Sequence, residues 1–173
     1  VSDASGVLAN SPFFRNLLVF NRPAEVTQDA GNGGIRAFSA PTNFQGVGYV
    51  PYANYTLGTA SLVDAGFDPA TGLSWGRWSG GIMGLSNGSN NAGVNLQGAA
   101  SLHYIFASSQ SGPVSLPLTG TATYDVVGST RPTSGSSVGT FNSATLNANF
   151  TARTVDFGVN FTNNGQTWNA SAS

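Results

Sequence analysis

ATLNANFTARTVDFGVNF, residues 144–161, carries two stripes in which every second side chain is apolar. The first stripe is Ala144, Leu146, Ala148 and Phe150, and the second is Val155, Phe157, Val159 and Phe161. Because successive side chains of a β-strand point to opposite faces, this alternation predicts two amphipathic strands. The connection at Ala152-Arg153 is short enough for a tight turn, so the two strands are predicted to form a hairpin.

The same period of two continues on both sides of this stretch. Trp168, Ala170 and Ala172 form a further stripe after Asn163-Asn164-Gly165, which is a strong hairpin signal because Asn-Gly tolerates positive φ at both central positions. Upstream, Val114–Val126 alternates along its whole length, and Leu102, Tyr104 and Phe106 form another stripe. Half-apolar strands that follow one another in this way predict an antiparallel meander, sandwich or barrel.

The first seventy residues alternate less regularly. Ser11–Phe20 is predicted to be a short helix, because Ser11 would be its N-cap and Pro12 its first residue. Ile35–Ser39 and Leu57–Ala65 are candidate strands. The fold class is therefore predicted to be all-β, an antiparallel barrel or sandwich, with one short N-terminal helix. Residues 1–71 are expected to be an irregular segment that supplies strands or an assembly arm, and residues 72–173 an antiparallel β-barrel-like domain.

The composition excludes several kinds of chemistry. Only 8% of the residues are charged, the six basic residues are all Arg, and the formal net charge is −1. Scattered Arg residues give no basic patch for nucleic acid, and no apolar stretch is long enough for a spanning helix. With no Cys and with His103 as the single histidine, thiolate and multi-histidine metal sites are excluded, and no cofactor or metal is expected. The chain starts at Val1 rather than Met, which is consistent with processing.

Four segments resemble a known family. GLSWGRW at residues 72–78, LHYI at 102–105, GTATY at 120–124 and the stretch 144–161 together resemble the β-barrel domain of transferrin-binding-protein-B-like bacterial proteins. The resemblance covers residues 72–173 and implies an antiparallel barrel in a bacterial envelope or surface protein. Residues 72–173 supply too few strands for that barrel. Either the first seventy residues provide the others, or the barrel is incomplete in one chain. No ligand-binding residue of the family can be assigned here.

Two aromatic groups are candidates for ligand binding. Trp75, Arg77 and Trp78 would form a platform with a cation–π pair, although a core Trp with Arg lying over it is the simpler interpretation. Tyr49, Tyr52 and Tyr55 recur at every third residue and would line a sugar- or protein-binding strip, unless they pack onto the barrel. For assembly, the candidate residues are the apolar side chains of the N-terminal segment, Phe13, Phe14, Leu17, Leu18 and Phe20.

Catalysis has little support in the sequence. A catalytic histidine needs a nucleophile or a carboxylate within reach, and no nucleophile motif accompanies His103, so a structural histidine is favoured over a hydrolase. Asp64 and Asp68 could supply oxygen ligands to Ca²⁺, but their spacing matches no EF-hand loop and favours a turn.

The sequence thus favours a protein that is not an enzyme. An uncharged Ser, Thr, Asn and Gly surface is unusual in the cytoplasm, so an extracellular or cell-surface location is expected, with the periplasm as a further alternative. The predicted function is surface binding or assembly by a non-catalytic bacterial β-barrel module, whose partners are other copies of itself, a surface protein or a glycan. The alternative is a structural subunit of an extracellular filament or layer, which polymerises by strand addition through its N-terminal segment.

Overall fold

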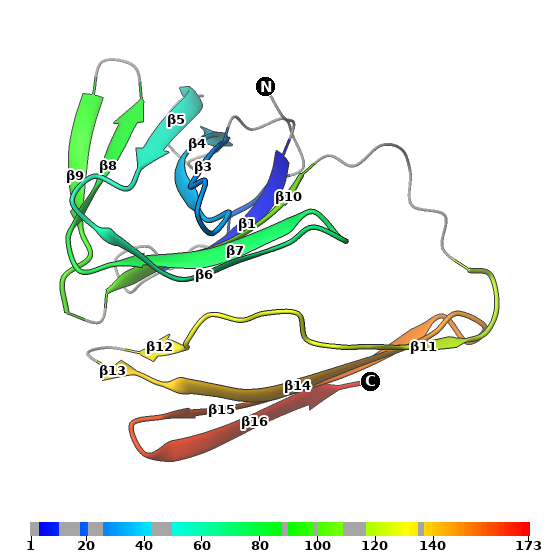
Figure 1. The fold of residues 1–173 in the computed structure, drawn as a ribbon. Helices are drawn as coiled ribbons and strands as arrows, with labels where there is room; N and C mark the ends of the chain where they lie inside the picture. Colours follow the sequence, from blue (N-terminus) through cyan, green and yellow to red (C-terminus); the bar gives the residue numbers. More distant parts are fainter. Residues whose placement is uncertain are drawn as a thin grey trace. The chain divides into compact units, whose positions relative to one another are not determined.

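The computed structural model describes residues 4–10, 18–20, 26–42, 50–87, 90–98, 100–108, 117–134 and 137–173. Within these ranges every regular element is a β-strand and every strand pair is antiparallel, which confirms the predicted all-β class (Figure 1). The chain divides into two compact units, Val1–Gln110 and Ser111–Ser173. A boundary was expected near residue 71, but this residue lies in the turn between two paired strands of the first unit.

The described residues of the first unit form two five-stranded sheets. In order across the first sheet, the strands are β2 (Leu18–Phe20), β1 (Ala4–Asn10), β10 (Ser101–Ser108), β7 (Leu73–Ser79) and β6 (Ser61–Asp68). The second sheet consists of β3 (Val26–Gln28), β4 (Ile35–Thr42), β5 (Val50–Thr56), β8 (Ile82–Asn87) and β9 (Asn90–Asn95). Neither sheet closes on itself through the described strands, so the unit is a sandwich rather than a closed barrel.

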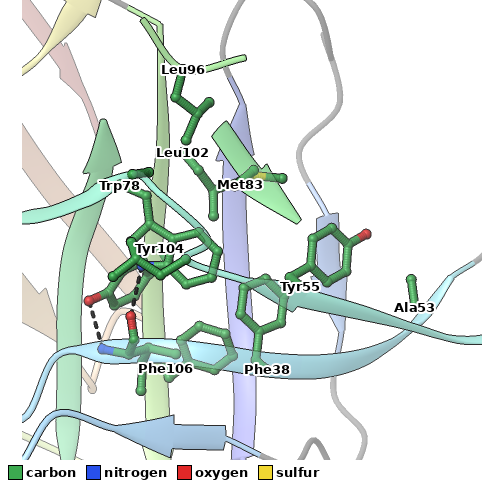
Figure 2. Close-up of a cluster of buried hydrophobic side chains, with 12 residues drawn as sticks. Phe38, Ala53, Tyr55, Trp78, Met83, Leu96, Leu102, Tyr104 and Phe106 are labelled. Atoms are coloured by element: carbon green, nitrogen blue, oxygen red, sulfur yellow. Dashed lines mark hydrogen bonds between the residues drawn. The ribbon is translucent and has the colours of Figure 1, made fainter. Parts of the chain in front are cut away.

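The core of the first unit lies between these sheets (Figure 2). Phe38 from β4 contacts Tyr55, Trp78 and Phe106 at ring-centroid distances of 4.5, 5.7 and 5.2 Å. Because these rings come from β4, β5, β7 and β10, the aromatic cluster joins the two sheets. The period-two stripe of Leu102, Tyr104 and Phe106 provides the buried face of β10, as its alternation predicts.

Ile35 at the start of β4 is held by two core side chains. Its carbonyl accepts a hydrogen bond from Trp78 Nε1 at 2.7 Å, and its N–H donates to the Tyr104 hydroxyl at 2.8 Å. Ile35 is fully buried, so both backbone groups need protein partners. A Cβ at Gly76 would overlap the Tyr104 hydroxyl, which explains a glycine in the middle of β7. Burial raises the pKa of Tyr104 to about 12.

The described residues of the second unit form one four-stranded sheet and one small hairpin. The sheet order is β11 (Thr121–Tyr124), β14 (Thr140–Asn149), β15 (Thr154–Asn163) and β16 (Gln166–Ala172). The hairpin is β12 (Thr133–Ser134) with β13 (Ser137–Val138). Asn163 ties the hairpin to the end of β15, because its side chain accepts a hydrogen bond from Ser137 and donates to Pro132 O at 3.4 Å.

Two expectations about individual elements were wrong. Within the predicted helix Ser11–Phe20, Leu18–Phe20 form β2, and residues 11–17 lie outside the described residues. The backbone of β2 pairs with β1, and this pairing takes the place of the hydrogen bonds that a helix would form within itself. In the described part of the predicted strand Val114–Val126, which is residues 117–126, only Thr121–Tyr124 form a strand, and residues 114–116 lie outside the described residues. Gly120 has φ +99° just before β11, and Leu118 is 91% exposed, so the sheet does not extend over residues 117–120.

Candidate functional site

The predicted platform of Trp75, Arg77 and Trp78 is divided between the two faces of β7. Trp78 is 0% exposed and belongs to the core. Arg77 is also buried, on the opposite side of the strand, and Trp75 packs against Gly66, where a Cβ would overlap its ring. Trp78 therefore stabilises the sandwich and offers no surface to a ligand.

Arg77 is the centre of a buried polar cluster. Its Nε donates to Asp64 Oδ2 at 2.9 Å, and its terminal nitrogen donates to Ser101 Oγ at 2.9 Å. The register of β7 and β10 places His103 directly opposite Arg77. Asp64 reaches Arg77 from a bulge in β6, where it adopts φ +54°. Arg77 thus joins Asp64 and Ser101 in one buried cluster beside His103, in which Arg77 and Asp64 form an ion pair.

His103 is expected to make the stability of the first unit depend on pH. Burial and the nearby Arg77 charge lower the pKa of His103 from 6.5 to about 4, while Asp64 opposes this shift. The folded chain therefore keeps the histidine neutral at pH 5, whereas the unfolded chain protonates it. Its stabilising contribution is complete above about pH 6.5 and is lost as the pH falls towards 4, a change of about 2–3 kcal/mol.

Urea denaturation between pH 4 and 7 checks this expectation. His103→Gln should flatten the slope of the unfolding free energy against pH in that window, since the chain has one histidine. An unchanged slope in the variant would show that another group produces the pH dependence. Hydrogen bonds lower the pKa values of Asp29 and Asp68 from the ordinary 3.8, so their stabilising contribution is lost as the pH falls below about 5, and the contribution of His103 is separated from theirs between about pH 5 and 7.

The other predicted residues lie in several places. Tyr55 is buried and stacks on Phe38. Tyr52 is in β5, and nothing is described of its side chain; Tyr49 lies outside the described residues. Phe13, Phe14 and Leu17 also lie outside them, whereas Leu18 and Phe20 pair with Leu8 and Gly6 of β1. The structure therefore does not bring Tyr52 and Tyr55 together as one exposed strip, since Tyr55 belongs to the core.

Asp64 and Asp68 have separate roles. Asp64 pairs with Arg77, whereas Asp68 accepts hydrogen bonds from Ala70 N and Thr71 Oγ1 in the turn between β6 and β7. This supports the turn interpretation of Asp68. Among the described residues, no three His, Cys, Asp or Glu side chains come together as metal ligands would. Nor do those residues include a helix that is long and apolar enough to cross a membrane.

The most unusual surface lies on the second unit. We call it the apolar face, and it consists of four rows that cross the strands in register. In order along β14, the rows are Ala122–Ala148–Val155, then Tyr124–Leu146–Phe157–Ala172, then Ala144–Val159–Ala170, and finally Phe141–Phe161–Trp168. Rows of small side chains thus alternate with rows of large ones.

Most of the large side chains of the apolar face are open to solvent, whereas Phe141 and Phe161 are half-buried. Trp168 is 56% exposed, Phe157 46% and Tyr124 45%. Among the described residues of the second unit, no apolar side chain is buried. Fully exposed aromatic side chains present about 150–250 Å² each, so these three alone leave roughly 300 Å² of apolar surface, and the smaller members bring the face to about 500 Å².

The opposite face of the same sheet is polar. Thr123 donates to Asn147 Oδ1 at 2.8 Å, and Asn142, Asn160 and Asn169 form a ladder of side-chain hydrogen bonds across β14, β15 and β16. None of the charged residues of the second unit belongs to the four rows of the apolar face. Asp156 pairs with Asn147 on the polar face, Arg153 lies in the β14–β15 turn, and Asp125 and Arg131 lie outside the strands.

The sequence contained the signal for the apolar face. The stripes of 144–161 and of Trp168–Ala172 are its members, and their alternation predicts amphipathic strands of a meander, sandwich or barrel. Alternation reports which side chains share a face, but it carries no information about what covers that face. The structure places these stripes on a single-layer sheet.

No protein-family model matches the chain, and neither a curated protein nor a solved structure matches it. The resemblance to transferrin-binding-protein-B-like barrels therefore stays a prediction, and the function has to be inferred from the geometry of the chain itself.

Proposed function

We propose that this chain is a non-catalytic, extracytoplasmic module of a bacterial surface, which binds or assembles with a partner through the apolar face. The apolar face is the observation that carries this proposal. A patch of several hundred Å² is at the upper end of what soluble monomers expose, and such patches mark interaction sites. A single sheet that leaves its apolar side in water also lacks the second layer that β-domains need for stability.

Three further features support this function. The chain has few charged residues and is rich in Ser, Thr, Asn and Gly, which favours a location outside the cytoplasm. Arg77 engages both Ser101 and Asp64, which favours a structural role for the cluster around His103. None of the four charged residues of the second unit belongs to the rows of the apolar face, so a partner that covers these rows packs against uncharged side chains.

The filament alternative has less support. It requires the N-terminal segment to add as a strand to a neighbour. β1 already pairs along its whole length with β10 of its own chain, from Ala4 opposite Ser108 to Asn10 opposite Leu102. Donation of this segment would therefore first break that pairing.

The accessibility of the apolar face tests the proposed function. The dilute, monomeric chain is expected to bind the hydrophobic dye anilinonaphthalene sulfonate while it keeps a cooperative unfolding transition. The double variant Phe157→Thr/Trp168→Thr should lose most of the dye signal. The matched double variant Asn147→Thr/Asn169→Thr changes the polar face of the same sheet and should keep it.

Quenching of tryptophan fluorescence tests the exposure of the apolar face independently of the dye. Trp168 is the one tryptophan of the second unit, so in a Trp75→Phe background its fluorescence is distinguished from that of the buried Trp78. Acrylamide should quench Trp168 readily in the monomer. A monomer that binds no dye and protects Trp168 from acrylamide would have its face covered within one chain, and that result would overturn the proposal.

A further inference from the structure

We propose that the partner that covers the apolar face is a second copy of this chain, packed face to face on the same surface across a twofold axis. This proposal rests on the proposed function and names its partner. The resulting interface would be closed and isologous, so it would produce a dimer and no longer polymer.

The order of the rows makes the apolar face complementary to itself. Small, large, small and large rows follow one another along β14, represented by Ala148, Leu146, Ala144 and Phe141. A twofold axis that lies parallel to the rows, midway between the Leu146 row and the Ala144 row, reverses this order in the second copy. Each large row then lies over a small row, which is the interdigitation found between the sheets of a sandwich.

The central strand shows the match most directly. With that axis, β15 of one copy lies over β15 of the other, in the reverse direction. Phe157 of each copy then faces Val159 of the other, and Phe161 faces Val155. A twofold axis along the strands would instead place Phe157 over Phe157, so the alternation selects the first arrangement. On β14 the same axis sets Leu146 over Ala144.

The charge of the chain and the area of the apolar face are both compatible with a second copy as the partner. The apolar face carries no ionised side chain, and a net charge of −1 gives little repulsion between copies. About 500 Å² of apolar surface from each copy gives roughly 1,000 Å² in total, which reaches the lower bound for a specific interface. Homodimer interfaces are also the most apolar class of interface.

The decisive experiment is sedimentation equilibrium of the full chain with a swap of two side chains on β15. The wild type is expected to form a dimer that dissociates on dilution. Val159→Phe fills the groove that receives Phe157, so it should raise the dimer Kd by about tenfold or more. The swapped double variant Phe157→Val/Val159→Phe restores a large side chain opposite a small one, and its Kd should return to within about threefold of the wild type.

The control is Asn169→Phe, which adds the same aromatic side chain to the polar face and should leave the Kd unchanged. Failure of the swap to recover dimerisation would overturn the proposed arrangement, as would a dimer that is indifferent to Val159→Phe. Open-ended oligomers would point to pairing through the edge strand β16 and would also overturn it.

The two proposals fail in different ways. A chain that stays monomeric at all concentrations, yet binds dye on the apolar face, would overturn the second copy and leave the proposed binding function standing. A monomer with a covered face would overturn both.

Discussion

Trp78→Ala is expected to lower the free energy of unfolding of the first unit by about 4–5 kcal/mol. Trp78 is fully buried, and truncation of a buried Trp costs about 3–5 kcal/mol in lost transfer energy and cavity formation. The substitution also removes the donor to Ile35 O, which leaves a buried carbonyl without that partner and adds a further penalty. Since domains are stable by only about 5–15 kcal/mol, the variant should be close to unfolding at 37 °C.

Trp78→Phe separates the two contributions. It keeps most of the ring that packs on Phe38 at 5.7 Å, but it cannot donate to Ile35 O. We expect it to cost about 2 kcal/mol. Urea denaturation followed by circular dichroism measures both variants. Equal losses for Phe and Ala would mean that the hydrogen bond, not the packing, dominates, and a loss below about 1 kcal/mol for Ala would contradict the central place of Trp78 in the core.

Arg77→Leu is expected to be the second most destabilising change, at about 3–5 kcal/mol. The side chains of Arg77 and Asp64 are only 3% and 15% exposed. Removal of the arginine leaves the Asp64 carboxylate in a poorly hydrated place without its cation. Ser101 Oγ also loses the hydrogen bond that it accepts from Arg77. Thermal and urea denaturation should both record the loss.

The double variant Arg77→Leu/Asp64→Asn gives the control for this ion pair. Because it removes the carboxylate charge along with its partner, it should recover part of the stability that Arg77→Leu loses. A double variant that is no more stable than Arg77→Leu would assign the cost to packing of the arginine stem rather than to charge. The pH dependence should change as well, since the Arg77 charge contributes to the low pKa of His103.

Local chemistry made the C-terminal strands predictable. The alternation in 144–161 and the Asn164-Gly165 turn each depend on a few neighbouring residues, and the structure has both Asn164 and Gly165 at positive φ, at 52° and 71°. Arg153, in the predicted tight turn, has φ 60°. The pairing register of neighbouring strands follows because their apolar stripes must lie on the same face of the sheet.

The features that the sequence did not predict correctly depend on residues that are distant in the chain. Leu18–Phe20 is a strand because β1 is beside it, and no local pattern in Ser11–Phe20 reports that neighbour. The Asp64–Arg77 pair needs the bulge in β6 to turn the carboxylate towards β7, so the spacing of the two residues in the sequence gave no sign of it. The sequence allowed Trp78 to be either a core residue or part of a binding platform. Only its packing in the structure, where it is fully buried, distinguishes the two interpretations.

The double anchoring of Ile35 has a consequence for motion. Its N–H and carbonyl are bound by Tyr104 of β10 and Trp78 of β7, whereas Ile35 itself belongs to β4 in the other sheet. Any sliding or separation of the two sheets must release this one peptide segment. The exchange rate of the Ile35 amide hydrogen with deuterium is therefore a single-residue gauge of how often the sandwich opens.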